Sequence, residues 1–385
     1  MGRTLSSSEV AIVGAAESPY TRHPPSGHTT EWVLVDAVRR ALADGGLHRD
    51  DVDGLGLCSF TLAPDHAIDL AWRMGMSLSW VMEDTNGGAC GPNMLQHAVH
   101  AIEAGDASVV VLVAGDRLVG SDLDHIADNY NRVTRDYLAP LPLQGPNTLF
   151  SFLTQRHMQR YGLEREDYGL IAISQRRWAG LNPGAVYRTP LTMEEYLAAP
   201  PVAPPLHRYD CVPPVTGADA IVVATRDRVP NAPAALVRAV GGSYNHDKHE
   251  GDGLSTGLAA VAPKAWERAG VGPEDVGLVC VYDDYPVMVL VQLADLGFIS
   301  SGDPKQFLRT RLERECWPLN TSGGQLSAGQ SGAGGGLHGL VEAAMQLRGR
   351  AGGRQVEARF AVVSGYGMVL VRHGACANLA ILERA

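Results

Sequence analysis

Short, uniformly apolar runs alternate with longer segments of helical periodicity along the first third of the chain. Residues 10–14 and 108–114 are apolar at nearly every position, which is typical of strands buried on both faces. Residues 30–43 and 92–104 carry apolar side chains at the three- and four-residue spacing of an amphipathic helix. With a further strand at 52–60, this pattern predicts an α/β fold in which helices cover both faces of a sheet.

The segment at about 117–215 interrupts this alternation. It is richer in Pro, Tyr and Arg and has helical stretches near 149–161 and 166–178, which indicates an excursion outside the main sheet. A buried strand resumes at 218–224, and the proline-flanked residues 230–233 are the best linker candidate. We therefore divide the chain into an N-terminal half, 1–230, which includes the excursion, and a C-terminal half, 231–385.

The second half repeats the pattern of the first. Segment 41–47 ends a helix and precedes an acidic turn, Val52 and a strand; segment 265–271 precedes an acidic turn, Val276 and a strand at the same spacing. Each half later has a glycine-rich turn, an apolar helix and a buried strand. Two matches in the same order predict an internal duplication, with a site between the equivalent turns.

The two glycine-rich turns lie at 85–92 and 320–332, each directly before an apolar helix. Glycines at such a position permit positive φ angles and the close approach of a ligand. They also expose N–H groups at the positive end of the helix dipole. Such a turn can stabilise a thioester oxyanion or a phosphate, or it can simply allow tight packing of helix on sheet.

Charge and cysteine content narrow the class of protein. The chain has 42 acidic and 32 basic residues and a net charge of −10, which argues against general nucleic-acid binding. Six scattered cysteines without a CxxC motif predict reduced thiols, and His97 and His100 are not at metal-ligand spacing. The polar start and the lack of an apolar run of about 18 residues predict a cytoplasmic protein with no membrane span.

On these motifs the chain resembles the thiolase superfamily, and it is most similar to the branch of sterol-carrier-protein-type thiolase-like proteins. The resemblance covers nearly the whole chain and implies the thiolase fold, two duplicated halves in a five-layered αβαβα arrangement. Counting from the helix end at 102–105 places the family's nucleophilic Cys at Gly88, two residues before Cys90. Gln330 stands where the His of the family's Gly-His-Pro motif should be, and Ser364 resembles the C-terminal acid–base Cys.

Ordinary thiolase activity is not expected. Thiolysis needs both a thiolate and a base, and the two positions hold Gly88 and Gln330 instead. Cys90 is either an off-register nucleophile or a small thiol that packs at a helix start. Tyr282 replaces the Asn of the family's Asn-Glu-Ala-Phe motif, and Tyr285 keeps its aromatic position. Each tyrosine is either a proton-transfer group or a hydrogen-bonded core aromatic.

This inventory resembles the steroid side-chain-cleaving aldolases, a branch that lacks the thiolase Cys and His and uses tyrosines. Their Tyr-Asp-x-aromatic motif is similar to residues 282–285, and their Asn-Thr-x-Gly-Gly-Gln-Leu is similar to residues 320–326. Their second catalytic Tyr falls on Gln330. The resemblance implies a retro-aldol lyase that cuts a β-hydroxyacyl-CoA into a ketone or aldehyde and a shorter acyl-CoA.

In this hypothesis Tyr282 takes the proton of the β-hydroxyl while Asp283 orients the phenol. Gln330 or Tyr366 supplies the contact that the second catalytic Tyr makes in the aldolases. The N–H groups at Gly88 and of a loop at 365–367 hold the thioester oxygen. The expected catalytic residues are Tyr282, Asp283, Gln330 and Tyr366, and the expected substrate-binding residues are Gly88, Cys90, Gly324, Gly365 and Gly367. We expect no metal and no tightly bound cofactor, with the CoA thioester as substrate.

Two other functions stay open. One is a thiolase-like acyltransferase subunit that uses Cys90 or a partner's thiol, and the other is a non-catalytic scaffold that binds acyl-CoA or lipid. The resemblance also implies a homodimer formed through the strand at 108–114. It further implies a small partner protein with an OB fold and a zinc ribbon.

Overall fold

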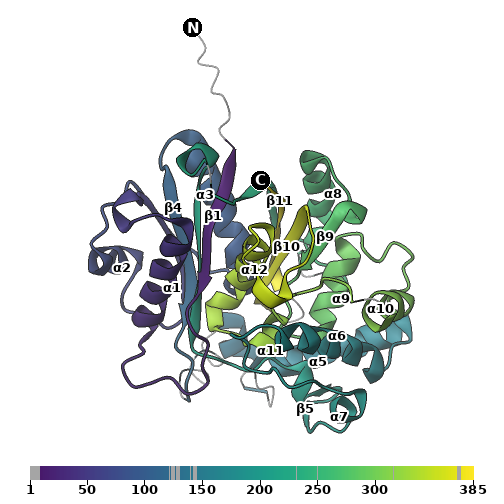
Figure 1. Cartoon of the computed structure of the whole chain (residues 1–385). Helices are drawn as coiled ribbons and strands as arrows, with labels where there is room; N and C mark the ends of the chain where they lie inside the picture. The colour runs from purple at the N-terminus through teal and green to yellow at the C-terminus, as the bar shows by residue number, and fades with distance from the viewer. Residues whose placement is uncertain are drawn as a thin grey trace.

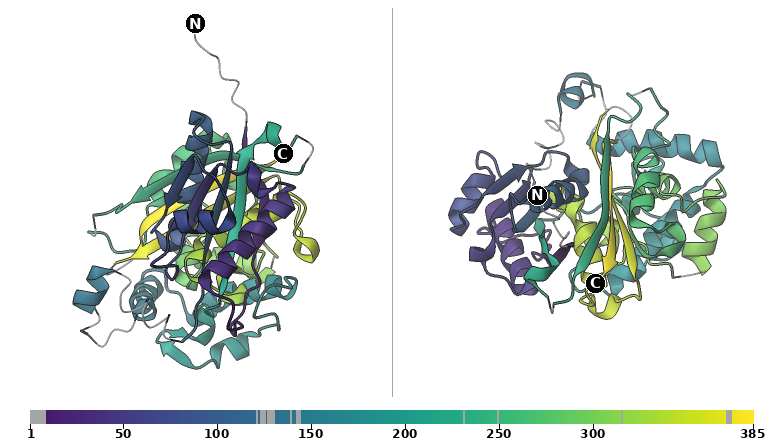
Figure 2. Two further views of the ribbon diagram at one scale, coloured as in Figure 1. Left: turned by 90° about the vertical axis from the view of Figure 1, so that its left-hand side faces the viewer. Right: turned by 90° about the horizontal axis from the view of Figure 1, so that it is seen from above.

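The computed structural model describes residues 9–120, 122, 126, 131–138, 140–141, 145–230, 232–248, 250–314, 316–370 and 374–385. Two half-sheets enclose a central layer of helices, and further helices cover their outer faces (Figures 1 and 2). The predicted five-layered αβαβα arrangement is confirmed. None of the helices in these ranges is long and apolar enough to cross a bilayer.

The N-terminal half-sheet has the strand order β3-β2-β4-β7-β1. Its strands are β1 (Val10–Glu17), β2 (Gly54–Cys58), β3 (Trp80–Glu83), β4 (Val109–Asp116) and β7 (Gly217–Thr225). Helices α1 (Thr30–Gly45) and α2 (Ala67–Met74) cover its outer face, and α3 (Cys90–Ala104) lies on its inner face. All eight residues of β4 are buried, as its uniformly apolar sequence predicts.

The C-terminal half-sheet has the order β9-β10-β11-β8 and repeats the order β2-β4-β7-β1 of the first half. Its strands are β8 (Ala235–Tyr244), β9 (Val276–Cys280), β10 (Phe360–Val369) and β11 (Gly374–Arg384). The pairings match as well: β2–β4 and β9–β10 are parallel, β4–β7 and β10–β11 are antiparallel, and so are β7–β1 and β11–β8. Two residue pairs between β1 and β8 join the half-sheets edge to edge. The predicted duplication is therefore visible in the topology.

The remaining helices of the C-terminal half follow the same plan. Helices α8 (Leu258–Ala269), α9 (Pro286–Asp295) and α10 (Pro304–Leu308) lie on the outer side of the C-terminal half-sheet. Helix α11 (Gly324–Ala328) lies within the second glycine-rich segment, and α12 (Gly335–Leu347) begins after it. Helices α1 and α8 end on Gly46 and Gly270, each with φ 67° and ψ 27°. Glycine tolerates this left-handed conformation and closes the helix, so the repeated turn has the same cause in both halves.

The central helices α3 and α12 share one apolar cluster with both half-sheets. Met94 and Leu95 of α3 are in this cluster with Leu337 and Leu340 of α12, and all four side chains are fully buried. Because the two helices pack directly on each other, the turns that precede them are held in a fixed relation.

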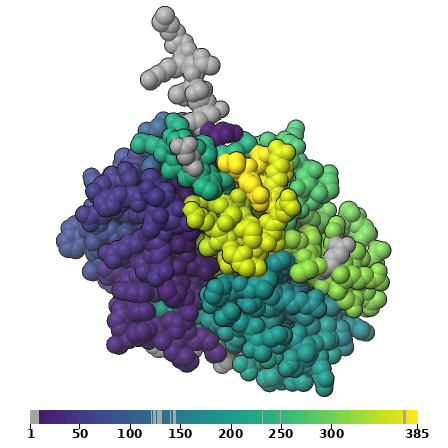
Figure 3. All heavy atoms as spheres, in the orientation of Figure 1, coloured from purple at the N-terminus to yellow at the C-terminus, as the bar shows by residue number. Residues whose placement is uncertain are grey.

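The excursion between β4 and β7 packs against the C-terminal half. It contains α5 (Gly145–Tyr161), α6 (Arg165–Gly180), α7 (Met193–Leu197), β5 (Pro201–Ala203) and β6 (Leu206–His207). Helices α5 and α6 contact α9, and α6 also contacts α10 and α11. This teal segment forms the lower right part of the molecule in Figure 3, next to the green part of the C-terminal half.

The predicted dimerisation strand is wrong. Strand β4, which contains the expected segment 108–114, lies between β2 and β7, so both of its edges are already hydrogen-bonded. The strand at the end of this half-sheet is β3. The predicted division at 230/231 falls between β7 and β8 and stays a prediction.

Candidate active site

The two glycine-rich turns meet at the centre of the molecule. Residues Gly87–Ala89 form a single 3-10 turn before α3, and Gly332–Gly334 form the equivalent turn before α12. A Cβ on Gly91 would lie 2.1 Å from the carbonyl oxygen of Gly336, and one on Gly336 would lie 2.4 Å from that of Gly87. Only glycine permits so close an approach. The two turns meet as the duplication predicts, and a site between them stays a prediction.

The ring of Tyr282 fills the space that a side chain at residue 88 would take. A Cβ on Gly88 would lie 2.3 Å from Cζ of Tyr282 and 2.5 Å from the carbonyl oxygen of Tyr366. Tyr282 follows the end of β9 and is 7% exposed. The C-terminal half thus places a phenol where the resemblance puts a thiolate in the N-terminal half.

The carboxylate that contacts this phenol is Asp284. The Tyr282 hydroxyl donates a hydrogen bond to Oδ2 of Asp284 at 2.9 Å, so the orienting contact expected of Asp283 is wrong. Burial raises the pKa of Asp284 to about 7, although the hydrogen bond from Tyr282 opposes that shift. Its Oδ1 is buried without a hydrogen-bond partner among the described residues. A phenol paired with a carboxylate that titrates near neutral pH can accept and pass on a proton.

Asp283 instead shapes the second turn. Its carboxylate accepts the N–H groups of Gln325 at 3.0 Å and Leu326 at 3.3 Å, at the start of α11. A Cβ on Gly324 would lie 2.1 Å from Oδ2 of Asp283, so this contact requires a glycine. Burial raises the pKa of Asp283 to about 6, and the hydrogen bonds from the backbone lower it. The residue therefore holds the turn together beneath the phenol.

Gln330 and Tyr366 both have partners in their own segments. Oε1 of Gln330 accepts the N–H of Gly332 at 3.1 Å, and the backbone of Gln330 pairs with residues 213 and 215. The hydroxyl of Tyr366 accepts the N–H of Gly374 at 2.8 Å, within the β10–β11 pair. A catalytic role for either residue stays a prediction.

The expected loop at 365–367 is a regular part of strand β10, which corrects the prediction of a glycine loop. Its glycines allow the first turn to lie flat on the strand. A Cβ on Gly365 would lie 2.9 Å from Cα of Ala89, and one on Gly367 would lie 2.9 Å from N of Gly88. Nδ2 of Asn378 donates to the carbonyl of Ala89 at 2.8 Å and fixes this contact.

The thiol of Cys90 lies beneath the first turn. The residue is 0% exposed, and its Sγ is 3.4 Å from the carbonyl oxygen of Ala333, to which it donates. Burial, with the nearby Cys58, raises the pKa of this thiol well above its ordinary value. A protonated, buried thiol suits packing between α3 and α12 rather than nucleophilic attack.

The excursion borders the site through Tyr285. Its hydroxyl donates to Oδ1 of Asn147 at 2.6 Å, and its ring stacks on Phe150 of α5 at 4.7 Å between centroids. On the other side, Nε2 of Gln292 donates to the carbonyl oxygen of Tyr282 at 2.6 Å. Both contacts fix the backbone that carries the phenol.

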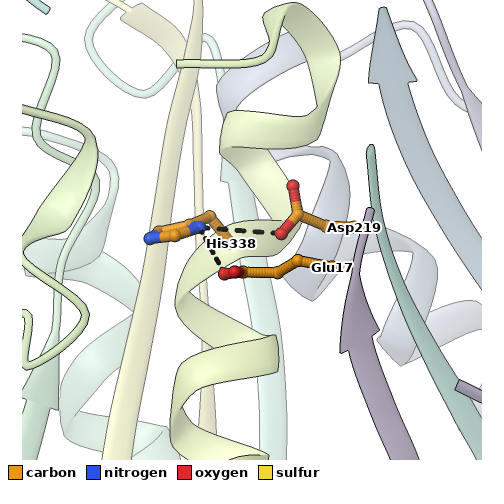
Figure 4. Close-up of side chains that lie close together, drawn as sticks. All are labelled: Glu17, Asp219 and His338. Atoms are coloured by element: carbon orange, nitrogen blue, oxygen red, sulfur yellow. Dashed lines mark ion pairs between the residues drawn. The ribbon is translucent and has the colours of Figure 1, made fainter. Parts of the chain in front are cut away.

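A buried charged cluster next to the site was missed from the sequence. His338 of α12, Asp219 of β7 and Glu17 of β1 point toward one another (Figure 4). Nδ1 of His338 is 3.2 Å from Oε1 of Glu17 and 3.6 Å from Oδ1 of Asp219. The three groups are close enough to hold a metal ion, and a protonated His338 would offset one of the two carboxylate charges.

The sequence did contain a signal for this cluster. Asp219 interrupts the uniformly apolar run of β7, and His338 lies in an otherwise apolar stretch of α12. A charge in a fully buried element needs a partner, so two such residues point to each other.

A small cavity of about 10 Å³ lies between His338 and the residues after β9. Residues after β9, at the start of α11 and along α12 line it, among them Tyr282, Asp283, Ser322, Gln325, Gly335 and His338. Oε1 of Gln325 is buried here without a hydrogen-bond partner among the described residues. An unsatisfied buried acceptor is costly, and a cavity of this size suits a single water molecule.

Known proteins resemble the chain over most of its length. The family model for the thiolase C-terminal domain-like family matches residues 241–382. A steroid side-chain-cleaving aldolase of Thermomonospora curvata is 31% identical, over 88% of this chain and 90% of that protein. A 17-hydroxy-3-oxo-4-pregnene-20-carboxyl-CoA lyase of Mycobacterium tuberculosis is also 31% identical, over 89% of this chain and 92% of the lyase.

A solved structure of the Ltp2-ChsH2(DUF35) aldolase superposes with a TM-score of 0.82 at 27% identity, and the alignment covers 98% of each chain. An acetyl-CoA acetyltransferase from Syntrophomonas wolfei superposes with a TM-score of 0.70 at 16% identity, which shows likeness of fold alone.

Proposed function

This chain belongs to the thiolase superfamily, in the branch of the steroid side-chain-cleaving aldolases, and from that membership we propose how its site cleaves a β-hydroxyacyl-CoA. The protein is a thiolase-like retro-aldol lyase. The observation that carries the proposed roles is the ring of Tyr282 over Gly88, hydrogen-bonded to Asp284. It puts a proton acceptor, rather than a nucleophile, at the centre of the site.

In the proposed reaction, Tyr282 accepts the proton of the substrate's β-hydroxyl as it passes its own proton to Asp284. The Cβ–O bond becomes a carbonyl, the Cα–Cβ bond breaks, and its electron pair moves into the thioester as an enolate. Helices α3 and α12 both begin at the site, so their positive ends stabilise the developing charge on the thioester oxygen. A ketone or aldehyde and a shorter acyl-CoA leave.

We propose a fused-ring acyl group, such as a steroid, as the substrate class. The relatives named above act on such substrates, and Phe150 of the excursion stacks on Tyr285, three residues after the phenol. Purified protein mixed with a β-hydroxyacyl-CoA should release the ketone and the shorter acyl-CoA in equal amounts, measured by chromatography. Release of free CoA without a ketone would instead support the acyltransferase alternative.

The rate of cleavage should depend on the ionisation of Asp284. Because burial raises the pKa of this carboxyl to about 7, the group is mostly protonated at lower pH and cannot accept a proton from Tyr282. We expect kcat to rise with pH through about 7 and then level off. A pH profile of kcat checks this, and a rate that falls as pH rises through that range would contradict the role of Asp284.

We propose that two copies of the chain associate at the open edge of β3. Val81 on this strand is 46% exposed, and Ile68 and Trp72 on the adjacent α2 are 62% and 79% exposed. An exposed edge strand beside an apolar patch is typical of an interface.

Replacing Val81 by Lys should convert the dimer into a monomer, because it puts a charge on the pairing edge. Light scattering measures the mass. Leu181→Lys is the matched control, since Leu181 is 50% exposed on the excursion and should leave the mass unchanged. A wild-type protein with the mass of one chain would refute the interface.

We also propose that the chain works with a small OB-fold partner that carries a zinc ribbon. The solved Ltp2-ChsH2(DUF35) aldolase is an assembly of this lyase type with a second component. Co-purification of the native protein should recover such a partner, and full activity of the isolated chain would make the partner unnecessary.

A further inference from the structure

The polar atoms of Glu17, Asp219 and His338 are spaced like the ligands of a metal ion. Nδ1 of His338 is 3.2 Å from Oε1 of Glu17 and 3.6 Å from Oδ1 of Asp219 (Figure 4). A Zn²⁺ ion bound at about 2.0–2.2 Å holds neighbouring nitrogen and oxygen ligands about 3.0–3.6 Å apart. The usual N–H···O hydrogen bond is shorter, about 2.9–3.0 Å between the heavy atoms. The spacing therefore fits an ion between the three groups.

One oxygen of Asp219 faces this position without a hydrogen bond. Asp219 is 0% exposed, and its Oδ1 has no hydrogen-bond partner among the described residues. Its other oxygen, Oδ2, accepts the hydroxyls of Tyr20 at 2.6 Å and Ser331 at 3.3 Å. The carboxylate is thus fixed through Oδ2 and presents Oδ1 to the histidine. A buried, unsatisfied carboxylate oxygen is costly, and a bound cation would remove that cost.

The far side of the imidazole ring is held by Ser322. Nε2 of His338 lies 2.8 Å from Oγ of Ser322. When Nε2–H donates to this hydroxyl, Nδ1 carries the lone pair that faces the carboxylates. Metal-binding histidines are almost always oriented in this way, with the second ring nitrogen hydrogen-bonded to an oxygen. The oxygen of Tyr20 lies 3.2 Å from Nδ1, so it can complete a set of four ligands.

Charge balance favours a divalent cation over ion pairs alone. Two carboxylates against one imidazole leave at least one negative charge unbalanced, whether or not the ring is protonated. The charge of Arg354 also acts on Glu17, but its guanidinium is paired with Glu342 at 2.8 Å. An uncompensated charge in the interior is costly. A divalent ion beside a neutral imidazole balances both carboxylates.

The type of ligand selects the class of metal. An imidazole with carboxylates suits Zn²⁺ and its first-row neighbours, whereas Mg²⁺ and Ca²⁺ prefer oxygen ligands alone. The side chain of Glu17 is 18% exposed, which gives an ion a path from solvent. The expectation of no metal rested on residue spacing along the chain, whereas these ligands come from β1, β7 and α12.

We propose that Glu17, Asp219 and His338 bind a divalent transition-metal ion such as Zn²⁺, with the oxygen of Tyr20 as the fourth ligand. The ion joins β1 and β7 of the N-terminal half to α12 of the C-terminal half. Through His338 it also holds Ser322, which lies in the second glycine-rich turn. The role of the ion is structural, so the inference does not depend on the lyase reaction.

Metal content and thermal unfolding test the site. The full chain is stripped with a chelator and titrated with Zn²⁺, and the metal retained after gel filtration is measured by mass spectrometry. We expect about one Zn²⁺ per chain, and a Tm higher by about 3 °C or more when free Zn²⁺ is at about 100 times Kd. Mg²⁺ at the same concentration should leave Tm unchanged. Absence of bound Zn²⁺ with an unchanged Tm would overturn the inference and leave the cluster as ion pairs.

Variants of the ligands locate the ion. Asp219→Asn and Glu17→Gln should each weaken Zn²⁺ binding by about 10²-fold or more, and Ser322→Ala by about 10–10²-fold. His157→Gln is the matched control, because His157 is equally buried at 3% exposure but its Nδ1 faces the hydroxyl of Tyr168 at 2.9 Å. This control should bind Zn²⁺ as the wild type does. Unchanged affinity in Asp219→Asn with a native circular-dichroism spectrum would contradict the site.

The exposed pair of His66 and Glu83 is a competing location for the ion, since Nδ1 of His66 is 3.1 Å from Oε2 of Glu83. Loss of Zn²⁺ in His66→Gln with retention in Glu17→Gln would place the ion there and refute the buried site. Co²⁺ gives a measurement on the wild-type chain, which does not depend on the folding of any variant. Bound by four nitrogen and oxygen ligands, it should show visible absorption bands that added Zn²⁺ removes. A stripped wild-type protein without these bands would refute four-coordinate binding.

Discussion

Tyr282→Phe is expected to lower kcat for cleavage of a β-hydroxyacyl-CoA by about 10²–10⁴-fold with little change in KM. The ring keeps its place over Gly88, so the substrate pocket keeps its shape. What disappears is the hydroxyl that bonds to Asp284 and accepts the substrate proton. Steady-state kinetics with quantified ketone release measures the effect.

Tyr285→Phe is the matched control for this change. Tyr285 is buried three residues further along the chain, and its hydroxyl donates to Asn147. Loss of that hydrogen bond should cost about 1 kcal/mol of folding stability but leave kcat within the same order of magnitude. Asp284→Asn should reproduce the loss seen in Tyr282→Phe. An unchanged kcat in Tyr282→Phe would refute the proposed roles.

The architecture could be predicted from the sequence because local residue patterns determine it. Uniformly apolar strands such as β4 and β7 fix a sheet covered on both faces, and the repeated helix-ending glycines Gly46 and Gly270 reveal the duplication. The free edge of the sheet was not accessible. Strand β3 has four residues with no strong pattern, and the resemblance pointed instead to the strand at 108–114, which lies inside the sheet.

The site was accessible in part. Comparison with the family motifs singled out Gly88 and Tyr282 separately, and the structure brings the two together. The choice between two consecutive carboxylates was not accessible, because backbone torsions after β9 decide which one turns toward the phenol. The segment at 365–367 was mistaken for a loop because its glycines serve the neighbouring turn rather than their own backbone.

The buried cluster depends on contacts between distant parts of the chain. Glu17, Asp219 and His338 come from β1, β7 and α12, and no local pattern states which strands face that helix. The unusual charges in apolar elements were visible, but their pairing follows only from the packing of the two halves. Ion pairs between residues far apart in the chain therefore cannot be predicted from a single sequence.

The first turn shows how one scaffold serves two chemistries. In the thiolase resemblance, residue 88 supplies the reactive side chain, and here it supplies none. Its space is filled from the other half by Tyr282, so the absence of a Cβ at Gly88 is a requirement of the new site. The glycine and the tyrosine are therefore one functional unit.

Gly88→Ala is accordingly expected to abolish most of the lyase activity, by about 10²-fold or more, although alanine has no reactive group. Its Cβ would lie 2.3 Å from Cζ of Tyr282, so the ring must move, and the hydrogen bond to Asp284 moves with it. Overpacking of this kind should also cost about 1–3 kcal/mol of stability. Kinetics and denaturant unfolding measure the two effects, with Gly27→Ala as control because no atom lies within 4 Å of its added Cβ.

A double-mutant cycle identifies what the added methyl group meets. If the ring of Tyr282 is the obstacle, Gly88→Ala should cost less stability in a Tyr282→Ala background than in the wild type. Some cost should persist, because the rigid carbonyl of Tyr366 in β10 lies 2.5 Å from the same Cβ position. Equal costs in both backgrounds would mean that the strand alone excludes a side chain at residue 88. For the same reason Gly88→Cys should not restore thiolysis, since its thiol would displace the phenol and find Gln330 where a base is needed.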